Sequence, residues 1–178
     1  MEKTNAIVIH PYNDERIIAG QGTAAKELLE DQPDLDVIIT PLSGGGLLSG
    51  TLCAAKNMKD GIKVYGAEPE EADDAYRSLK AGKRMANETT NTICDGLRAQ
   101  IGMINFPIIQ ELVDDIITLS EKEIIESMRL IWTRMKIIVE PSSSITLAAV
   151  IKNKDLFKNK KVGLILSGGN VDMDDLPW

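Results

Sequence analysis

The chain has 178 residues, a length typical of one domain, and a hydrophobic share of 43% that can supply a buried core. Lys and Arg number 20 against 27 Asp and Glu, and the resulting net charge of -7 argues against nucleic acid and anionic membranes as partners. No apolar run has the length of a membrane span, and no signal-peptide-like segment follows Met1. Cys53 and Cys94 form no short metal-binding spacing. We therefore expect a cytoplasmic protein with reduced cysteines.

Short apolar runs alternate with longer segments of helical periodicity along the chain. In chain order, we expect a strand over 5–9, a helix from Asp14 to before Pro33, a strand over 36–40, a helix through 48–55, a strand over 63–67, a largely irregular stretch over 82–105, a strand over 115–119, a helix through 124–135, a helix over 143–151 and a strand over 162–166. Asn13 is the expected cap of the first helix. Ser120 and Glu123 form a capping box before the third.

This alternation predicts an α/β fold with a largely parallel sheet. The strands are apolar enough to be buried on both faces, as in a layer covered by helices on each side. The sequence contains no internal repeat and no obvious interdomain linker. Residues 1–178 are therefore expected to form a single domain.

A run of three glycines, Gly44 to Gly46, stands between the strand over 36–40 and the helix that follows. Glycines let the backbone turn tightly, so that several N–H groups point at one spot beside the helix N-terminus. Such a nest suits an anion, and a phosphate is its natural occupant. A plain strand-to-helix turn is the other interpretation, although one or two glycines would suffice for it.

A dinucleotide-binding loop is an alternative to other phosphate sites. That loop has the pattern G-x-G-x-x-G and an acidic residue about 20 positions further on. Gly44 and Gly46 fit the first two glycines, but Ser49 stands at the third. Glu68, at the end of the next strand, can imitate the acid that binds a ribose. The sequence weakens this alternative without eliminating it.

Ser167 follows the last predicted strand and precedes Gly168 and Gly169. A hydroxyl at the carboxyl end of a strand is well placed to form a hydrogen bond with a ligand. A simple terminal turn explains the same residues equally well.

In order and spacing, these motifs resemble the family of serine racemase and threonine dehydratase, which are pyridoxal-phosphate (PLP) enzymes. The matching segments are 10–12, 18–23, 43–47, 68–69 with 72–74, 95–96, 134–136, 139–142 and 166–172, and they span nearly the whole chain. The resemblance implies a three-layer α/β/α fold with a largely parallel sheet, like that of the tryptophan synthase β chain. It also implies β-elimination or racemisation of a small hydroxy amino acid.

The resemblance assigns a set of residues to the cofactor PLP, in which the glycine loop holds the phosphate and Ser167 contacts the pyridine nitrogen. The set is Ser43, Gly44, Gly45, Gly46, Leu47, Gly96, Glu140 and Ser167. A serine at the ring nitrogen, unlike a carboxylate, does not strongly favour a protonated ring. The ring is then a weaker electron sink, which suits prompt loss of a β-hydroxyl. Many family members have a fourth glycine where Ser43 stands.

The resemblance also implies a divalent cation site, for Mg²⁺ or Ca²⁺, made by Glu68, Asp74 and the backbone carbonyl of Ala72. Hard oxygen ligands suit both ions, with water in the remaining positions. Its expected role is structural or activating. The alternative is a solvated acidic turn at the start of a helix.

One expected part of the family pattern is missing. In this family the lysine that forms an imine with PLP lies near the N-terminus, between Ser-Phe and Arg, and no such motif occurs here. We therefore expect most of the cofactor-binding domain without the lysine-bearing segment and the small domain. A split enzyme, a truncated gene product and a non-catalytic phosphate-binding or PLP-binding relic all fit. The expected partner is a complementing N-terminal half or a second copy, and the chain alone is expected to be inactive.

Overall fold

A four-stranded parallel sheet forms the centre of the molecule in the computed structural model, which describes residues 7–178. The strands are β1 (Val37–Pro41), β2 (Lys63–Pro69), β3 (Asp115–Leu119) and β4 (Val162–Leu164). Their order across the sheet is β3-β2-β1-β4, so the two central strands carry the glycine loop and the Glu68 turn at their carboxyl ends.

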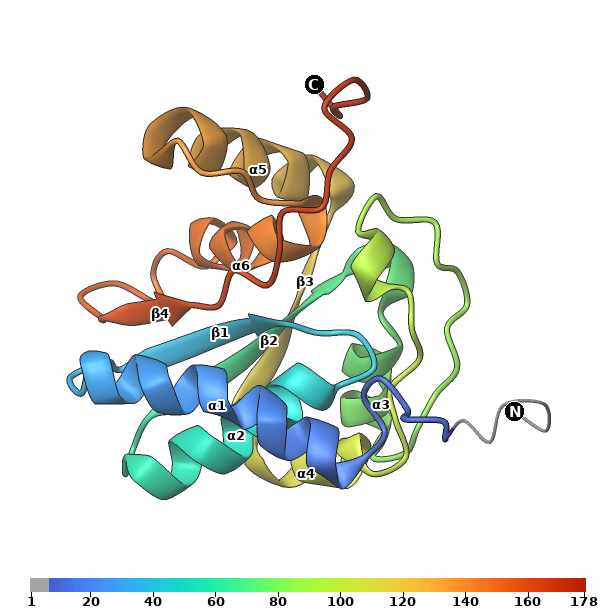
Figure 1. Cartoon of the computed structure of the whole chain (residues 1–178), viewed down its shortest axis with the longest axis vertical. Helices are drawn as coiled ribbons and strands as arrows, with labels where there is room; N and C mark the ends of the chain where they lie inside the picture. Colours follow the sequence, from blue (N-terminus) through green and yellow to red (C-terminus); the bar gives the residue numbers. More distant parts are fainter. Residues whose placement is uncertain (1–6) are drawn as a thin grey trace.

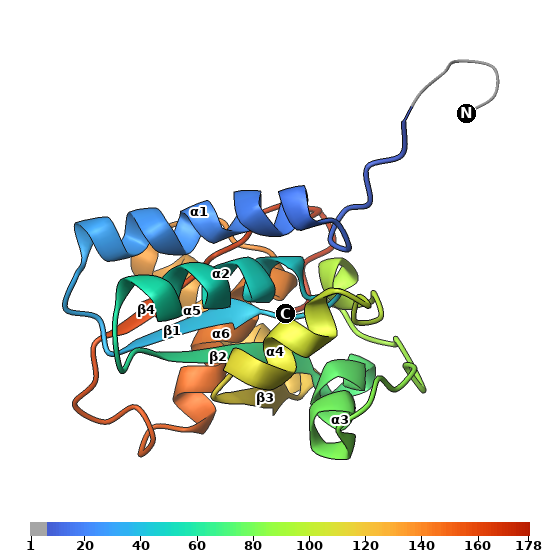
Figure 2. The same ribbon diagram turned by 90° about the horizontal axis from the view of Figure 1, so that it is seen from below.

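Helices cover both faces of this sheet (Figure 1). They are α1 (Glu15–Asp31), α2 (Gly46–Met58), α3 (Asp74–Ala81), α4 (Asn105–Leu112), α5 (Glu121–Met135) and α6 (Pro141–Lys152), with short 3-10 turns at Glu70–Ala72 and Asp95–Leu97. One face packs against α2, which lies beneath α1 and beside α4, and Figure 2 looks onto that side. The other face packs against α6, with α5 outside it. The expected three-layer α/β/α arrangement is confirmed.

Alternating side chains of β1 supply two separate cores. Ile38 belongs to the cluster with α1, α2 and α4, whereas Val37 and Ile39 belong to the cluster with α6. All three side chains are buried. A short strand buried on both faces is mostly apolar, with Thr40 the polar exception in β1, which explains why this run gave a clear signal in the sequence.

The expected strand over 5–9 is wrong for the part that can be described. Residues 7–9 are not in a strand, and residues 5 and 6 lie outside the described residues. Ile7 is 85% exposed. A strand exists only where a neighbouring strand pairs with its backbone groups, and within residues 7–178 none lies beside this segment.

The first helix begins one residue later than expected because its cap is Asp14 and not Asn13. The Asp14 side chain accepts a hydrogen bond from the Arg16 backbone N–H at 2.9 Å. The Asn13 side-chain oxygen instead accepts one from the backbone N–H of Ile104, at 3.0 Å. The expected capping box of Ser120 and Glu123 is confirmed at the start of α5.

Of the two short helices, α4 was not expected from the sequence, and α3 was expected only as the start of a helix after the acidic turn. Each has eight residues, only about two turns, which is shorter than the window over which helical periodicity can be recognised. Pro107, in the first turn of α4, also counts against a helix in the sequence, because proline is disfavoured inside helices. In the part of the chain that the structure describes, no helix is both long enough and apolar enough to cross a membrane.

Candidate functional site

The eight residues expected at the cofactor converge on one cavity of about 250 Å³ at the carboxyl end of β1. Its lining includes all of Ser43, Gly44, Gly45, Gly46, Leu47, Gly96, Glu140 and Ser167. These residues come from segments that are far apart in the sequence. They meet because parallel strands place their carboxyl ends at the same edge of a sheet, where α/β proteins bind ligands.

The glycine loop forms one wall, and its shape depends on the absence of side chains. Gly45 has a φ of +93°, in the left-handed region that favours glycine, and it directly precedes α2. A Cβ atom on Gly44 would lie 2.5 Å from the Tyr12 ring, and one on Gly46 would lie 3.0 Å from the Tyr12 Cβ. Tyr12 therefore packs directly over a bare backbone.

The backbone amides of this loop are available to an anion. The first N–H groups of a helix have no acceptor within the helix, and Gly45 offers α2 no side-chain cap. Within residues 7–178, the N–H groups of Gly45, Gly46 and Leu47 donate no hydrogen bond outside the helix. The positive end of the α2 dipole lies at the same place, which favours negative charge.

The Ser43 hydroxyl has a structural partner. It accepts a hydrogen bond from the Ala99 backbone N–H at 2.9 Å and donates one to the Ala99 carbonyl oxygen at 3.1 Å. This pair joins the glycine loop to the segment that carries Gly96. A contact from Ser43 to a ligand would therefore use its backbone and not its hydroxyl.

The opposite wall is built from Glu140 and the chain that follows β4. The Glu140 carboxylate accepts a hydrogen bond from the Asn170 backbone N–H at 2.9 Å, and the Glu140 N–H donates to the Gly168 carbonyl oxygen at 3.1 Å. A Cβ atom on Gly168 would lie 2.9 Å from the carboxylate. Glu140 thus holds the residues beside Ser167. The Ser167 hydroxyl is exposed and has no hydrogen-bond partner within the described part of the chain.

Gly96 lies between these walls at the base of α6. Its N–H donates to the Ser142 hydroxyl at 3.2 Å and to the Asp95 side chain at 2.9 Å. A Cβ atom at Gly96 would lie 3.1 Å from the Ser142 hydroxyl oxygen, so only glycine fits without a shift. Ser142, Tyr12 and Gln21 also line the cavity but were not among the expected site residues. Tyr12 lies in the segment 10–12, which resembles the family, and this resemblance was the signal that could have identified it as a site residue.

Glu68 and Asp74 lie outside this cavity and are both fully buried. The Glu68 carboxylate accepts hydrogen bonds from the backbone N–H groups of Ala75 at 3.1 Å and Tyr76 at 2.8 Å. One oxygen of Asp74 accepts from the Ile101 N–H at 2.8 Å, and the other has no hydrogen-bond partner among the described residues. The alternative of a solvated acidic turn is wrong for these two side chains. Glu68 is also too enclosed to contact a ribose at the glycine loop.

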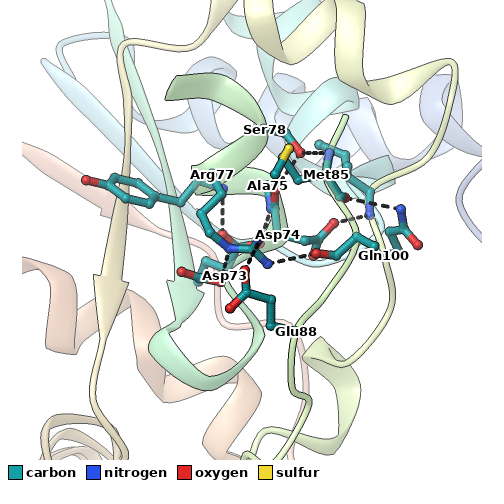
Figure 3. A network of polar contacts seen from close by, with 12 residues as sticks. Asp73, Asp74, Ala75, Arg77, Ser78, Met85, Glu88 and Gln100 are labelled. Atoms are coloured by element: carbon teal, nitrogen blue, oxygen red, sulfur yellow. Dashed lines mark hydrogen bonds and ion pairs between the residues drawn. The ribbon is translucent and has the colours of Figure 1, made fainter. Parts of the chain in front are cut away.

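Burial raises the pKa values of Glu68 and Asp74. Loss of solvation raises the pKa of Glu68 well above its ordinary value, and the charge of Asp74 adds to the effect. Burial also raises the pKa of Asp74 to about 6. Figure 3 shows the surrounding network, in which Arg77 pairs with Asp73 at 2.7 Å and not with either buried carboxylate. The third expected ligand, Ala72, ends the 3-10 turn between the two acids.

Cation-binding side chains are few here. Within residues 7–178, no three His, Cys, Asp or Glu side chains are grouped to hold a metal ion. The Asn87 side chain, however, lies close enough to Asp74 to offset part of the rise that burial causes in its pKa, and within residues 7–178 the Asn87 side-chain oxygen is buried without a hydrogen-bond partner. Two unsatisfied oxygens in one enclosed place are unusual, because buried polar atoms normally have partners.

Comparison with known proteins gives the family. The model of the family described as "Pyridoxal-phosphate dependent enzyme" matches residues 1–168. The chain is 50% identical to the serine racemase of Arabidopsis thaliana over 183 aligned positions, which cover 99% of this chain and 55% of that protein. It is 46% identical to the beta-hydroxyaspartate dehydratase of Paracoccus denitrificans, with 99% of this chain and 56% of that protein covered.

The fold agrees with these relatives. The solved structure of maize serine racemase matches with a TM-score of 0.94 and 44% identity, covering 97% of this chain and 54% of that one. The chain thus spans about half the length of the relatives that it matches. The expected resemblance and the expected fold of these enzymes are confirmed. This chain belongs to the family of pyridoxal-phosphate dependent enzymes.

Proposed function

We propose that this chain supplies the phosphate-binding and ring-binding walls of a PLP enzyme that acts on a small hydroxy amino acid, by β-elimination or racemisation. The observation that carries the proposal is the convergence of the glycine loop and Ser167 on one cavity. The names of the relatives, which include a serine racemase and a hydroxyaspartate dehydratase, support this class of substrate.

The residues present fit PLP. A phosphate needs several donors and room for close approach, and the bare backbone of Gly44 to Gly46 at the start of α2 offers both. Ser167 lies across the same cavity, and its hydroxyl, without a partner among residues 7–178, can bond to a ring nitrogen. When bound, PLP supplies an electron sink for the substrate's α-carbon.

Each wall then has a distinct task. The loop amides bind and orient the phosphate, and Tyr12 covers the loop from the α1 side. Ser167 holds the ring by a neutral hydrogen bond, and it does not force a proton onto the nitrogen as a carboxylate would. Glu140 keeps its carboxylate bonded to the Asn170 N–H and so fixes the position of the Ser167 turn.

We further propose that the lysine that anchors PLP comes from a segment outside this chain. None of the described residues that line the cavity is a lysine. Incubation with PLP, reduction with borohydride and peptide mass spectrometry test this point. A reduced PLP adduct on a lysine of this chain would contradict it.

The activity is tested by complementation. The chain is mixed with the part of the Arabidopsis thaliana serine racemase that it does not span, and keto-acid release from serine, threonine and hydroxyaspartate is measured. We expect release only from the mixture. Stable association without turnover or racemisation would favour the alternative, a non-catalytic PLP-binding module.

Glycine-loop variants add a binding test with a matched control. Gly45→Ala places a side chain at a φ of +93° and against Asn105, whereas Gly61→Ala places one at +77° in open space. Both variants place a side chain at a positive φ, but Gly45→Ala also brings it close to Asn105, and only Gly45 lies at the cavity. PLP affinity, measured by calorimetry, is expected to fall in Gly45→Ala alone. An equal fall in both variants would contradict phosphate binding by the loop.

We also propose a Mg²⁺ or Ca²⁺ site at Glu68, Asp74 and the carbonyl of Ala72, separate from the chemistry. The Asp74 and Asn87 oxygens that lack a partner in the described part of the chain support it, since both would gain one from a cation and its water. Glu68 and Asp74 are both buried, and the nearby Arg77 forms its ion pair with Asp73, which supports the site as well. A bound cation would favour the ionised forms that burial disfavours.

A further inference from the structure

Asn105 lies behind the glycine loop and not in the cavity. It is the first residue of α4, it is fully buried, and it does not contribute to the cavity lining. Its side-chain nitrogen donates to two backbone carbonyl oxygens, those of Tyr12 and Gly44, each at 2.9 Å. One amide thus joins α4 to both the loop and the tyrosine that covers it.

The Gly44 carbonyl oxygen has a second donor. The backbone N–H of Gly102 donates to it at 2.9 Å, so both of its lone pairs are engaged on the side away from the cavity. The peptide that joins Gly44 to Gly45 is planar and trans, so its N–H points opposite to its carbonyl. With the carbonyl held toward α4, the Gly45 N–H is directed to the other side of the peptide.

A loop of glycines does not fix this direction by itself. Glycine has nearly equal access to positive and negative φ, so a peptide between two glycines can rotate at low cost. In the rotated state a carbonyl oxygen would replace an N–H at the anion nest and would repel a phosphate. The loop therefore needs external restraints, and the Asn105 side chain supplies one beside the Gly102 N–H.

Resting on the proposed function, we propose that Asn105 is a positioning residue for the phosphate of PLP. Its amide nitrogen holds the Gly44 carbonyl so that the loop amides face the cavity, and it fixes Tyr12 over the loop at the same time. Packing supports the same role, because a Cβ atom at Gly45 would lie 2.8 Å from that of Asn105.

The test compares PLP with pyridoxal, which lacks only the phosphate. Dissociation constants of both are measured by calorimetry for the wild type and for Asn105→Ala. We expect PLP affinity to fall about tenfold in the variant while pyridoxal affinity stays unchanged. Inorganic phosphate should also compete less well for the variant. A merely structural role would not separate the two ligands.

Asn153→Ala is the matched control. The Asn153 side-chain nitrogen donates to the Ala149 carbonyl oxygen at 3.1 Å at the end of α6, so the control loses a similar bond away from the cavity. Its preference for PLP over pyridoxal should equal that of the wild type. If Asn105→Ala does not fold by circular dichroism, Asn105→Leu replaces it, since leucine is of similar volume, offers no N–H and adds no charge.

The outcomes are distinguishable. Equal weakening of PLP and pyridoxal in the Asn105 variant, or no weakening of either, overturns the positioning role and leaves the proposed function intact. A wild type that binds PLP no better than pyridoxal overturns phosphate binding by the loop, and with it both proposals.

Discussion

Gly22 of α1 and Gly50 of α2 bring the two helix backbones into direct contact. A Cβ atom on Gly22 would lie 2.8 Å from the carbonyl oxygen of Gly50, and one on Gly50 would lie 2.5 Å from the Gly22 nitrogen. This approach seats α1 on α2 and sets where the segment before α1 meets the glycine loop. We predict that Gly22→Ala lowers the free energy of unfolding by about 2 kcal/mol, because backbone must move to admit the methyl group. Urea unfolding measures the change.

Gly20 provides the comparison on the same helix. A Cβ atom there meets nothing within 4 Å. Gly20→Ala should therefore stabilise the protein by up to about 1 kcal/mol through helix propensity alone. Equal effects of the two substitutions would show that the close contact of α1 and α2 carries no energetic weight.

Divalent cations should stabilise the fold through Asp74. We predict that millimolar Mg²⁺ or Ca²⁺ raises the melting temperature by a few degrees over buffer with chelator, since a ligand of the folded state alone stabilises it. Asp74→Asn should abolish this rise. Asp73→Asn should keep it, because the Asp73 carboxylate bonds Arg77 at 2.7 Å and has no part in the site. A cation effect that survives in Asp74→Asn would contradict the assignment.

The raised pKa of Asp74 predicts a pH dependence without cations. Its pKa is about 6 in the folded protein against the ordinary value of 3.8, so between these values the folded state binds more protons than the unfolded state. The free energy of unfolding contributed by this group therefore falls as pH rises from about 4 to about 6. In chelator, wild type should lose stability relative to Asp74→Asn across this window. Urea titrations at several pH values give the difference, and a difference that is constant with pH would refute the shift.

The two cysteines should react at very different rates. Cys53 is exposed, whereas Cys94 is fully buried and its pKa is raised to about 12, mainly by that burial. Thiolate is the reactive form, so Cys94 should be inert in the folded state. A thiol reagent should titrate one group in native protein and two in denaturant. Cys53→Ser should leave none that reacts rapidly, and fast labelling of that variant would contradict the prediction.

The sequence could predict the parts of this fold that depend on local patterns. β1 is buried at every position and apolar at all but Thr40, and Ser120 with Glu123 forms a capping box within four residues. The convergence of Gly44 and Ser167 follows from parallel topology, which places the carboxyl ends of strands at one edge. Alternation of strands with helices was enough to predict that topology.

The parts that escaped prediction depend on contacts between distant segments. Asn13 and Asp14 are both good capping residues, and the choice between them is made by Ile104, which is 91 positions from Asn13 in the sequence. Asn105 contacts Gly44 across 61 positions and Tyr12 across 93. No periodicity or motif in one sequence encodes such pairs, so the residue behind the glycine loop could be found only from the three-dimensional structure.

The stretch from Ala99 to Gly102 is tied down at nearly every residue. Ala99 bonds the Ser43 hydroxyl, the Ile101 N–H bonds Asp74, and the Gly102 N–H bonds the Gly44 carbonyl. Hydrogen bonds at successive residues fix the number of residues that the chain must have between one bond and the next. Insertion or deletion of a single residue here would move the following N–H groups away from their acceptors. Length changes in an irregular connection are ordinarily tolerated at the surface, where most of this one lies.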